Sequence, residues 1–302
     1  MRFNREWTIF QRKQADDCLV GVVYPAAYAV GMSNLGFQWV LRQLDITPGF
    51  YGERFFHAPD AAAPRSLEGR RRPGDCHLLA LSVSFETDYL AVLQFLAAAG
   101  LPLQSARRDR RHPLVVAGGA ALQVNPEPLA SFVDIIVVGE AETAWAELLA
   151  AYRDTADRHE LLACLAGKPG FYVPSWWEIS YGEDGAIVQQ ERTADAPAGA
   201  EPVVRLPVLT ADDLAALEPP FTNLLSTGTE FARTLLVEVA RGCPTGCRYC
   251  WAGYRYRPVR PFAESRILAI ADAARGHTDK IGLVSTAVGQ YPDLARLMAD
   301  IE

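Results

Sequence analysis

The 302-residue sequence contains no uninterrupted run of about 18 apolar residues, so it lacks the usual signature of a membrane-spanning helix. It also lacks an excess of positive charge. Its 29 Lys and Arg face 36 Asp and Glu, and a net charge of −7 does not indicate binding to nucleic acid. The first residues, MRFNREWTIFQRKQ, have no apolar centre and no small-residue cleavage site of a signal peptide. We therefore expect a cytoplasmic protein.

Cysteine is scarce as well, with six in the whole chain. Outside secreted proteins, cysteines are more often free thiols or metal ligands than members of a disulfide framework. Three of them stand alone in strand-like or helical segments, where buried free thiols are the simplest interpretation: Cys18, Cys76 and Cys164. The other three crowd into eight positions of the stretch RGCPTGCRYCWAG, as Cys243, Cys247 and Cys250.

The first half of the sequence alternates apolar strand patterns with helical patterns, which is typical of an α/β fold. Strands are predicted at 18–25, 77–85, 113–119 and 133–142, and helices at 33–45, 88–100 and 141–154. Ser33 or Asn34 is suited to cap the first helix. Continuous apolar strands form a parallel sheet covered on both faces. Ligands of such sheets bind beyond the carboxyl ends of the strands, here beside Gly119 and Gly139.

The second half predicts a hairpin, a connector and two βα units. Residues 170–192 indicate two strands around GEDG, and the Ala- and Pro-rich residues 193–220 indicate an extended connector with one short helix near 212–217. Strands are predicted at 234–240 and 280–286, followed by helices at 261–276 and 291–302. We therefore divide the chain into a domain at 1–152, a hairpin and linker at 153–221, and a third segment at 222–302.

The spacing C-x3-C-x2-C at the end of a strand favours a soft metal centre. A structural zinc site needs four ligands, and the nearest candidate for a fourth is His277, beyond a predicted helix. A catalytic zinc accepts three protein ligands, but three cysteines in one tight loop are not its usual form. A cuboidal iron–sulfur cluster fits three thiolates better, because one iron is then left open for a substrate or cofactor.

The cysteine spacing, together with Tyr249 before the third cysteine and the preceding LLVEVARG, resembles the signature of the radical S-adenosylmethionine (SAM) superfamily. The resemblance implies a partial (βα) barrel whose first strand precedes the loop, and a 4Fe–4S cluster that cleaves SAM reductively to a 5′-deoxyadenosyl radical. It also implies that Cys243, Cys247 and Cys250 are the cluster ligands and that Tyr249 lies against the adenine. The usual Gly-Gly-Glu turn is replaced by VSTAVGQYPD, where Ser285 and Thr286 offer hydroxyls for SAM.

Residues 113–149 resemble the cobalamin-binding-like, Rossmann-type domain that precedes many radical SAM cores, with the pair Gly118 and Gly119 at a strand end. The stretches VGMSNLGFQWVLRQLD and SVSFETDY resemble an uncharacterised branch of the superfamily. The usual histidine motif for cobalamin is missing after the first strand, and the near match DCHLLA leads into a strand. We therefore interpret His77 as a strand-entry residue and predict that the domain does not use cobalamin.

Arginines gather in three places. The clusters at 64–75 and 105–112 lack interleaved aromatic residues, so we interpret them as solvated loops and not as a tRNA surface. Three more follow the cysteines in GYRYRPVRP, where they either meet a carboxylate or phosphate or stay solvated: Arg255, Arg257 and Arg260.

The sequence thus predicts an α/β protein with a Rossmann-like parallel-sheet domain, a β-hairpin linker and the start of a partial radical SAM barrel. Two βα units follow the linker, whereas the resemblance implies about six. We therefore expect a partner chain or fused domain to complete the barrel, and little activity from this chain alone. Two alternatives remain. One is a metal-stabilised interaction module without SAM chemistry. The other is a methylthiotransferase-like enzyme modifying RNA or protein, with Cys18, Cys76 and Cys164 holding a second cluster.

Overall fold

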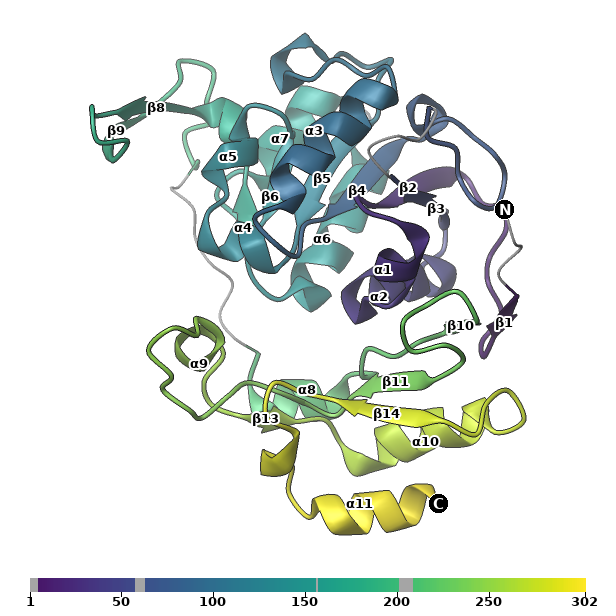
Figure 1. Ribbon diagram of the computed structural model, residues 1–302. Coiled ribbons are helices and arrows are strands. Elements are labelled where there is room, and N and C mark those ends of the chain that lie inside the picture. The colour runs from purple at the N-terminus through teal and green to yellow at the C-terminus, as the bar shows by residue number, and fades with distance from the viewer. Residues whose placement is uncertain (1–4, 58–62, 156, 201–208) are drawn as a thin grey trace. The chain divides into compact units, whose positions relative to one another are not determined.

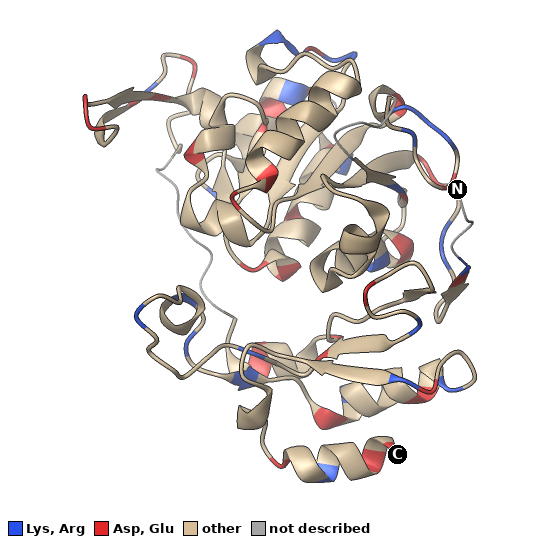
Figure 2. Cartoon of the chain, viewed as in Figure 1, with Lys and Arg blue, Asp and Glu red and all other residues tan. Residues whose placement is uncertain are grey.

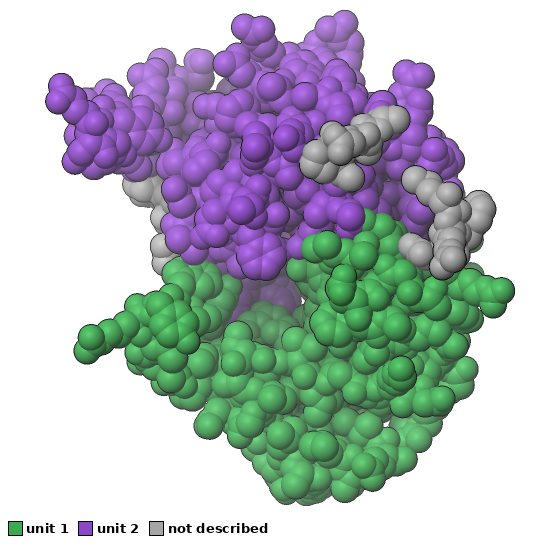
Figure 3. All heavy atoms as spheres, in the orientation of Figure 1, with its two compact units in different colours: residues 1–14, 28–48, 208–302 green, residues 15–27, 49–207 purple. Residues whose placement is uncertain are grey.

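The computed structural model describes residues 5–57, 63–155, 157–200 and 209–302 (Figure 1). Its contacts separate two compact units (Figure 3). We call residues 15–27 and 49–207 the sheet unit, and residues 1–14, 28–48 and 208–302 the cysteine unit. Both units are discontinuous in sequence. The division at 1–152, 153–221 and 222–302 stays a prediction, and residues 201–208 of the predicted connector lie outside the described residues.

The sheet unit is built on a six-stranded sheet in the order β3-β2-β4-β5-β6-β7, as formed by the described residues. Five strands are parallel: β2 (Cys18–Tyr24), β3 (Phe50–Phe56), β4 (Leu78–Ser82), β5 (Leu114–Gly118) and β6 (Ile135–Val137). The sixth, β7 (Phe171–Tyr172), pairs antiparallel with β6. This mostly parallel sheet confirms the predicted α/β, Rossmann-like fold, and four of its strands follow the predicted ranges closely.

The helices of the sheet unit are α3 (Asp88–Ala98), α4 (Ala120–Val124), α5 (Glu127–Ala130), α6 (Ala141–Asp154) and α7 (Arg158–Leu165). In the core of the unit, Val92 and Phe95 of α3 are fully buried and belong to the same cluster as Leu79 of β4 and Val115 of β5. Burying each such side chain contributes about 1.5 to 3 kcal/mol. The predicted hairpin is confirmed as β8 (Trp177–Tyr181) and β9 (Ile187–Arg192).

The strand β3 was not predicted, because charged residues interrupt its apolar pattern in FYGERFF. Both charged side chains are nevertheless buried. The Arg54 guanidinium pairs with Glu68 at 2.6 Å, and Glu53 pairs with Arg71 at 3.3 Å. The prediction that the first arginine cluster is solvated is therefore wrong for Arg71, which contacts the edge strand β3.

The cysteine unit contains three short two-stranded pairings among its described residues. Antiparallel pairs join β1 (Glu6–Thr8) to β10 (Leu224–Ser226) and β12 (Ala240–Arg241) to β13 (Arg260–Pro261). The parallel pair joins β11 (Leu235–Glu238) to β14 (Ile281–Val284), as expected for two successive βα units. The helices are α8 (Ala211–Ala216), α9 (Ala252–Arg255), α10 (Glu264–Ala274) and α11 (Leu294–Ile301).

Two further helices of the cysteine unit come from the first half of the chain, α1 (Tyr28–Met32) and α2 (Leu35–Ile46). The Asn34 side chain caps α2 by accepting a hydrogen bond from the Phe37 amide, as the sequence predicted. The buried Gln38 amide holds α2 to β10, because it both donates to the carbonyl and accepts from the amide of Leu224, each at 3.2 Å. Within the described ranges, none of the helices is long and apolar enough to cross a membrane.

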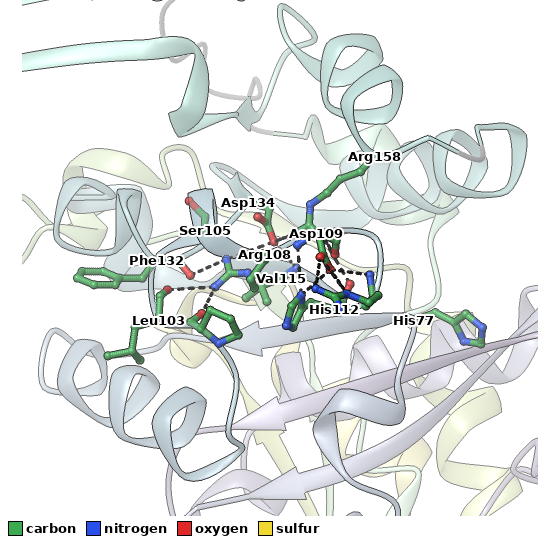
Figure 4. A network of polar contacts seen from close by, with 12 residues as sticks. His77, Leu103, Ser105, Arg108, Asp109, His112, Val115, Phe132, Asp134 and Arg158 are labelled. Carbon is green, nitrogen blue, oxygen red and sulfur yellow. Dashed lines mark hydrogen bonds and ion pairs between the residues drawn. The ribbon is translucent and has the colours of Figure 1, made fainter.

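The prediction that the second arginine cluster, at 105–112, is a solvated loop is wrong for Arg108. The Arg108 side chain is fully buried and lies 3.3 Å from the Asp134 carboxylate (Figure 4). Arg158, at the start of α7, reaches the same carboxylate oxygen at 2.6 Å, and the Val115 amide donates to it at 2.7 Å. Burial lowers the pKa of Arg108, while Asp134 opposes that shift. One buried carboxylate therefore organises two arginines and the start of β5.

We expect Asp134→Ala to lower the free energy of unfolding by about 3 to 5 kcal/mol, because two guanidinium groups then lose their buried counter-charge. Urea denaturation followed by circular dichroism measures the change. Asp109→Ala is the matched control, because Asp109 pairs with Arg111 at the surface of the same loop and its loss should cost far less. Equal destabilisation by the two substitutions would contradict this account of the loop.

Candidate functional site

The three clustered cysteines lie in a loop that begins where the parallel strand β11 and the short β12 end, as the sequence predicted. We call residues 242–258 the cysteine loop. Its two ends are joined by the antiparallel pairing of Arg241 with Arg260 and of Ala240 with Pro261. The loop is therefore a closed excursion at the carboxyl end of a parallel strand, which is where sheets and barrels of this class place their chemistry.

The base of the cysteine loop requires a glycine. Gly242 has a φ of +107°, and a Cβ added there would overlap the carbonyl oxygens of Tyr256 and Pro258. The same residue is tied to the end of the next parallel strand, because the Thr286 hydroxyl donates to the Gly242 carbonyl at 2.6 Å. The backbone at Gly242, directly before the first cysteine, is thus fixed on one side by Tyr256 and Pro258 and on the other by the segment after β14.

The short helix α9 packs on the first half of the cysteine loop. A Cβ on Gly253 would overlap the Thr245 carbonyl oxygen, so the helix backbone and the loop backbone are in direct contact. The Tyr254 hydroxyl donates to the Gly246 carbonyl at 3.2 Å. These contacts give the loop a defined backbone of its own.

All three cysteines of the loop are free thiols and half buried. Across the described ranges, no group of three or more His, Cys, Asp or Glu side chains has the arrangement to hold a metal ion, and this includes the three cysteines and His277. The loop nevertheless supplies a soft, all-thiol donor set of the kind that iron–sulfur clusters take. The assignment of Cys243, Cys247 and Cys250 as ligands stays a prediction.

The other predicted site residues lie beside the loop. The Tyr249 side chain is 92% exposed, so its ring is free to stack against a ligand. Ser285 lies at the end of β14, and its hydroxyl oxygen accepts a hydrogen bond from the Ala287 amide at 3.2 Å. The Thr286 hydroxyl donates its proton to the Gly242 carbonyl. Sequence reasoning missed this supporting role, because the two residues are 44 positions apart.

The remaining cysteines do not form a second group. Cys18 lies in β2 and Cys76 precedes β4, and burial raises the pKa of each thiol to about 12. Buried protonated thiols are poor metal ligands. Cys164 is exposed on α7. The second cluster of the methylthiotransferase alternative therefore has no preformed site among these three residues.

The carboxyl end of the sheet lies at Gly119 and Gly139, as predicted. A Cβ on Gly119 would overlap the Val83 carbonyl oxygen, so this strand end needs a glycine. His77 lies at the opposite end, immediately before β4, and its Nδ1 accepts a hydrogen bond from the Leu19 amide at 3.0 Å. This contact confirms His77 as a strand-entry residue. The absence of cobalamin stays a prediction.

Comparisons with known proteins support part of this interpretation. Residues 36–174 match the family of radical SAM proteins, N-terminal, which supports a place in the radical SAM superfamily. An uncharacterized protein of Methanocaldococcus jannaschii is 22% identical over 284 residues, covering 92% of this chain and 51% of that protein. The chain therefore spans about half the length of the curated relative that it matches. No solved structure matches. The family match ends before the cysteine loop.

We expect Thr286→Val to loosen the cysteine loop, because the Gly242 carbonyl loses a hydrogen bond worth about 1 kcal/mol. Amide hydrogen exchange in residues 242–258 should become about fivefold faster, as that free energy implies. Thr286→Ser keeps the hydroxyl and should exchange like the wild type. Ser285→Ala is a further control, because its hydroxyl contacts only the local turn among the described hydrogen bonds. Unchanged exchange in Thr286→Val would show that the hydrogen bond does not hold the loop.

Proposed function

We propose that this chain is an iron–sulfur protein of the radical SAM type, in which Cys243, Cys247 and Cys250 bind a 4Fe–4S cluster and SAM binds next to it. The observation that carries the proposal is the closed loop of three thiols at the carboxyl end of β11. The match of residues 36–174 to the radical SAM N-terminal family supports it independently, because that match does not include the loop. Iron–sulfur clusters and SAM are shared features of the superfamily as a whole.

In the proposed site, the chain's own residues would hold the cluster and orient SAM. The three thiolates would bind iron, and the glycines at 242 and 253 let the backbones of the loop and α9 approach each other closely. The exposed ring of Tyr249 stacks on the adenine. Ser285 directly follows β14, and its hydroxyl would be available to donate to a polar group of SAM. When bound, the cluster supplies the electron that cleaves SAM to methionine and a 5′-deoxyadenosyl radical.

We also propose that more of the barrel is needed for turnover. The parallel pair β11–β14 consists of two strands within the described residues, and β14 is only half buried along its length. Further strands or a partner chain would pair with this edge and complete the SAM site. The proposal is consistent with a relative about twice as long as this chain.

The metal prediction is that anaerobic reconstitution with iron and sulfide yields about four irons and four sulfides per chain and broad thiolate-to-iron absorption. Single substitutions of Cys243, Cys247 or Cys250 by Ala should abolish or sharply reduce both. The matched control is Cys164→Ala, because Cys164 is an exposed cysteine in a different element. Stoichiometric zinc that iron cannot displace would contradict the proposal and would favour the metal-stabilised interaction module.

The turnover prediction concerns this chain alone. Reduced with dithionite in the presence of SAM, it should release little 5′-deoxyadenosine, because within the described residues β14 pairs with β11 alone, and further strands would complete a SAM site. A longer form that adds further βα units should release more. Chromatographic measurement of 5′-deoxyadenosine gives the result directly. Robust release by the 302 residues alone would contradict the need for more of the barrel, but not the cluster assignment.

A further inference from the structure

The segment around the cysteines has a one-sided charge. Residues 239–263 contain five arginines and no Asp or Glu, in a chain whose net charge is −7. Figure 2 shows the loop that carries α9 with basic and no acidic segments. A concentration of positive charge without local carboxylates indicates that a negative group belongs there.

Most of these arginines have contacts that explain them. Arg241 pairs with Glu238 at 2.7 Å. Arg260 is buried and donates to the backbone carbonyls of Pro258 and Leu209. Arg257 lies over the Tyr254 ring, 5.6 Å from its centre. Arg248 is exposed within the loop, where water solvates its charge.

Arg255 is different. It is the last residue of α9, and its Nε and Nη2 atoms are buried without a hydrogen-bond partner in the part of the chain that the structure describes. Its guanidinium lies 5.6 Å from the centre of the Tyr256 ring, a contact that satisfies no N–H donor. Arg255 as a whole is half buried, but buried N–H donors without an acceptor are costly, so these two donors call for a partner. The neighbouring residues Gly253 and Tyr254 hold this helix against the cysteine loop.

We infer that Arg255 is the counter-charge of the cluster, pairing with its thiolate and sulfide sulfurs. The inference rests on the proposed function. Three cysteine thiolates bring three negative charges into a half-buried loop, and one-electron reduction adds another. A guanidinium with unused donors stabilises the reduced cluster more than the oxidised one, and it favours retention of iron in both states. Arg255 is then a positioning and charge-tuning residue, outside the ligand set.

The test compares Arg255→Gln and Arg255→Lys with Arg248→Gln, which removes an exposed arginine from the same loop. In the cluster-free chain, Arg255→Gln should leave the melting temperature unchanged or raise it, because it removes a half-buried charge whose two buried donors have no acceptor among the described residues. In the reconstituted chain, the same substitution should hasten iron loss to a chelator severalfold. At a fixed potential it should lower the ratio of reduced to oxidised cluster about tenfold, a shift of about 59 mV for one electron.

Arg255→Lys keeps the charge and should stay within about threefold of the wild type in that ratio, and Arg248→Gln should do the same. A melting temperature that falls in Arg255→Gln, with an unchanged ratio, would mean a structural role and would overturn the inference. An unchanged ratio with weaker SAM binding would assign the arginine to the SAM carboxylate and would overturn it too. A wild-type chain that takes up no iron would contradict the proposed function itself, whatever the variants do.

Discussion

The close approach at Gly242 is the constraint on which the cysteine loop depends. The backbone there passes so near the carbonyls of Tyr256 and Pro258 that a single added carbon would overlap both. Because the chain enters and leaves the loop at this point, the position of the first cysteine follows from it. The β12–β13 pairing, the hydrogen bond from Thr286 and the packing of α9 all operate around this contact. A loop held by backbone contacts leaves its side chains available for ligands.

The buried charges of the two units have different meanings. In the sheet unit, Asp134 binds two arginines and a backbone amide, so the group is satisfied internally and serves the fold. In the cysteine unit, Arg255 is half buried, its Nε and Nη2 atoms are buried without an acceptor among the described residues, and residues 239–263 contain no carboxylate. The arginines around Asp134 therefore stabilise the fold, whereas we infer that the partner of Arg255 comes from outside the chain. Residue type and local composition alone do not make this distinction.

Much of the sheet could be predicted, because most of its strands are apolar without interruption. The helix α2 of the cysteine unit could be predicted from its periodicity and its cap at Asn34. The edge strand β3 could not, since its central Glu53 and Arg54 are buried only through partners elsewhere in the chain. The burial of Arg108 could not be predicted for the same reason, because its partner Asp134 lies elsewhere in the chain. At the candidate site, the sequence supplied the cysteines and Tyr249. The hydrogen bond between Thr286 and Gly242 joins residues 44 positions apart. It forms because β11 and β14 are neighbours, which no local sequence pattern encodes.

The path of the chain through the two units has a consequence for how the protein is made. The helices α1 and α2 are synthesised between β2 and β3, yet α2 is held through Gln38 to Leu224 of β10, which is synthesised 186 residues later. Until then the Gln38 amide lacks its hydrogen-bond partners on the backbone of Leu224. The cysteine unit therefore forms late, after the sheet unit has left the ribosome. Assembly of a cluster in its loop would therefore follow the synthesis of the whole sheet unit.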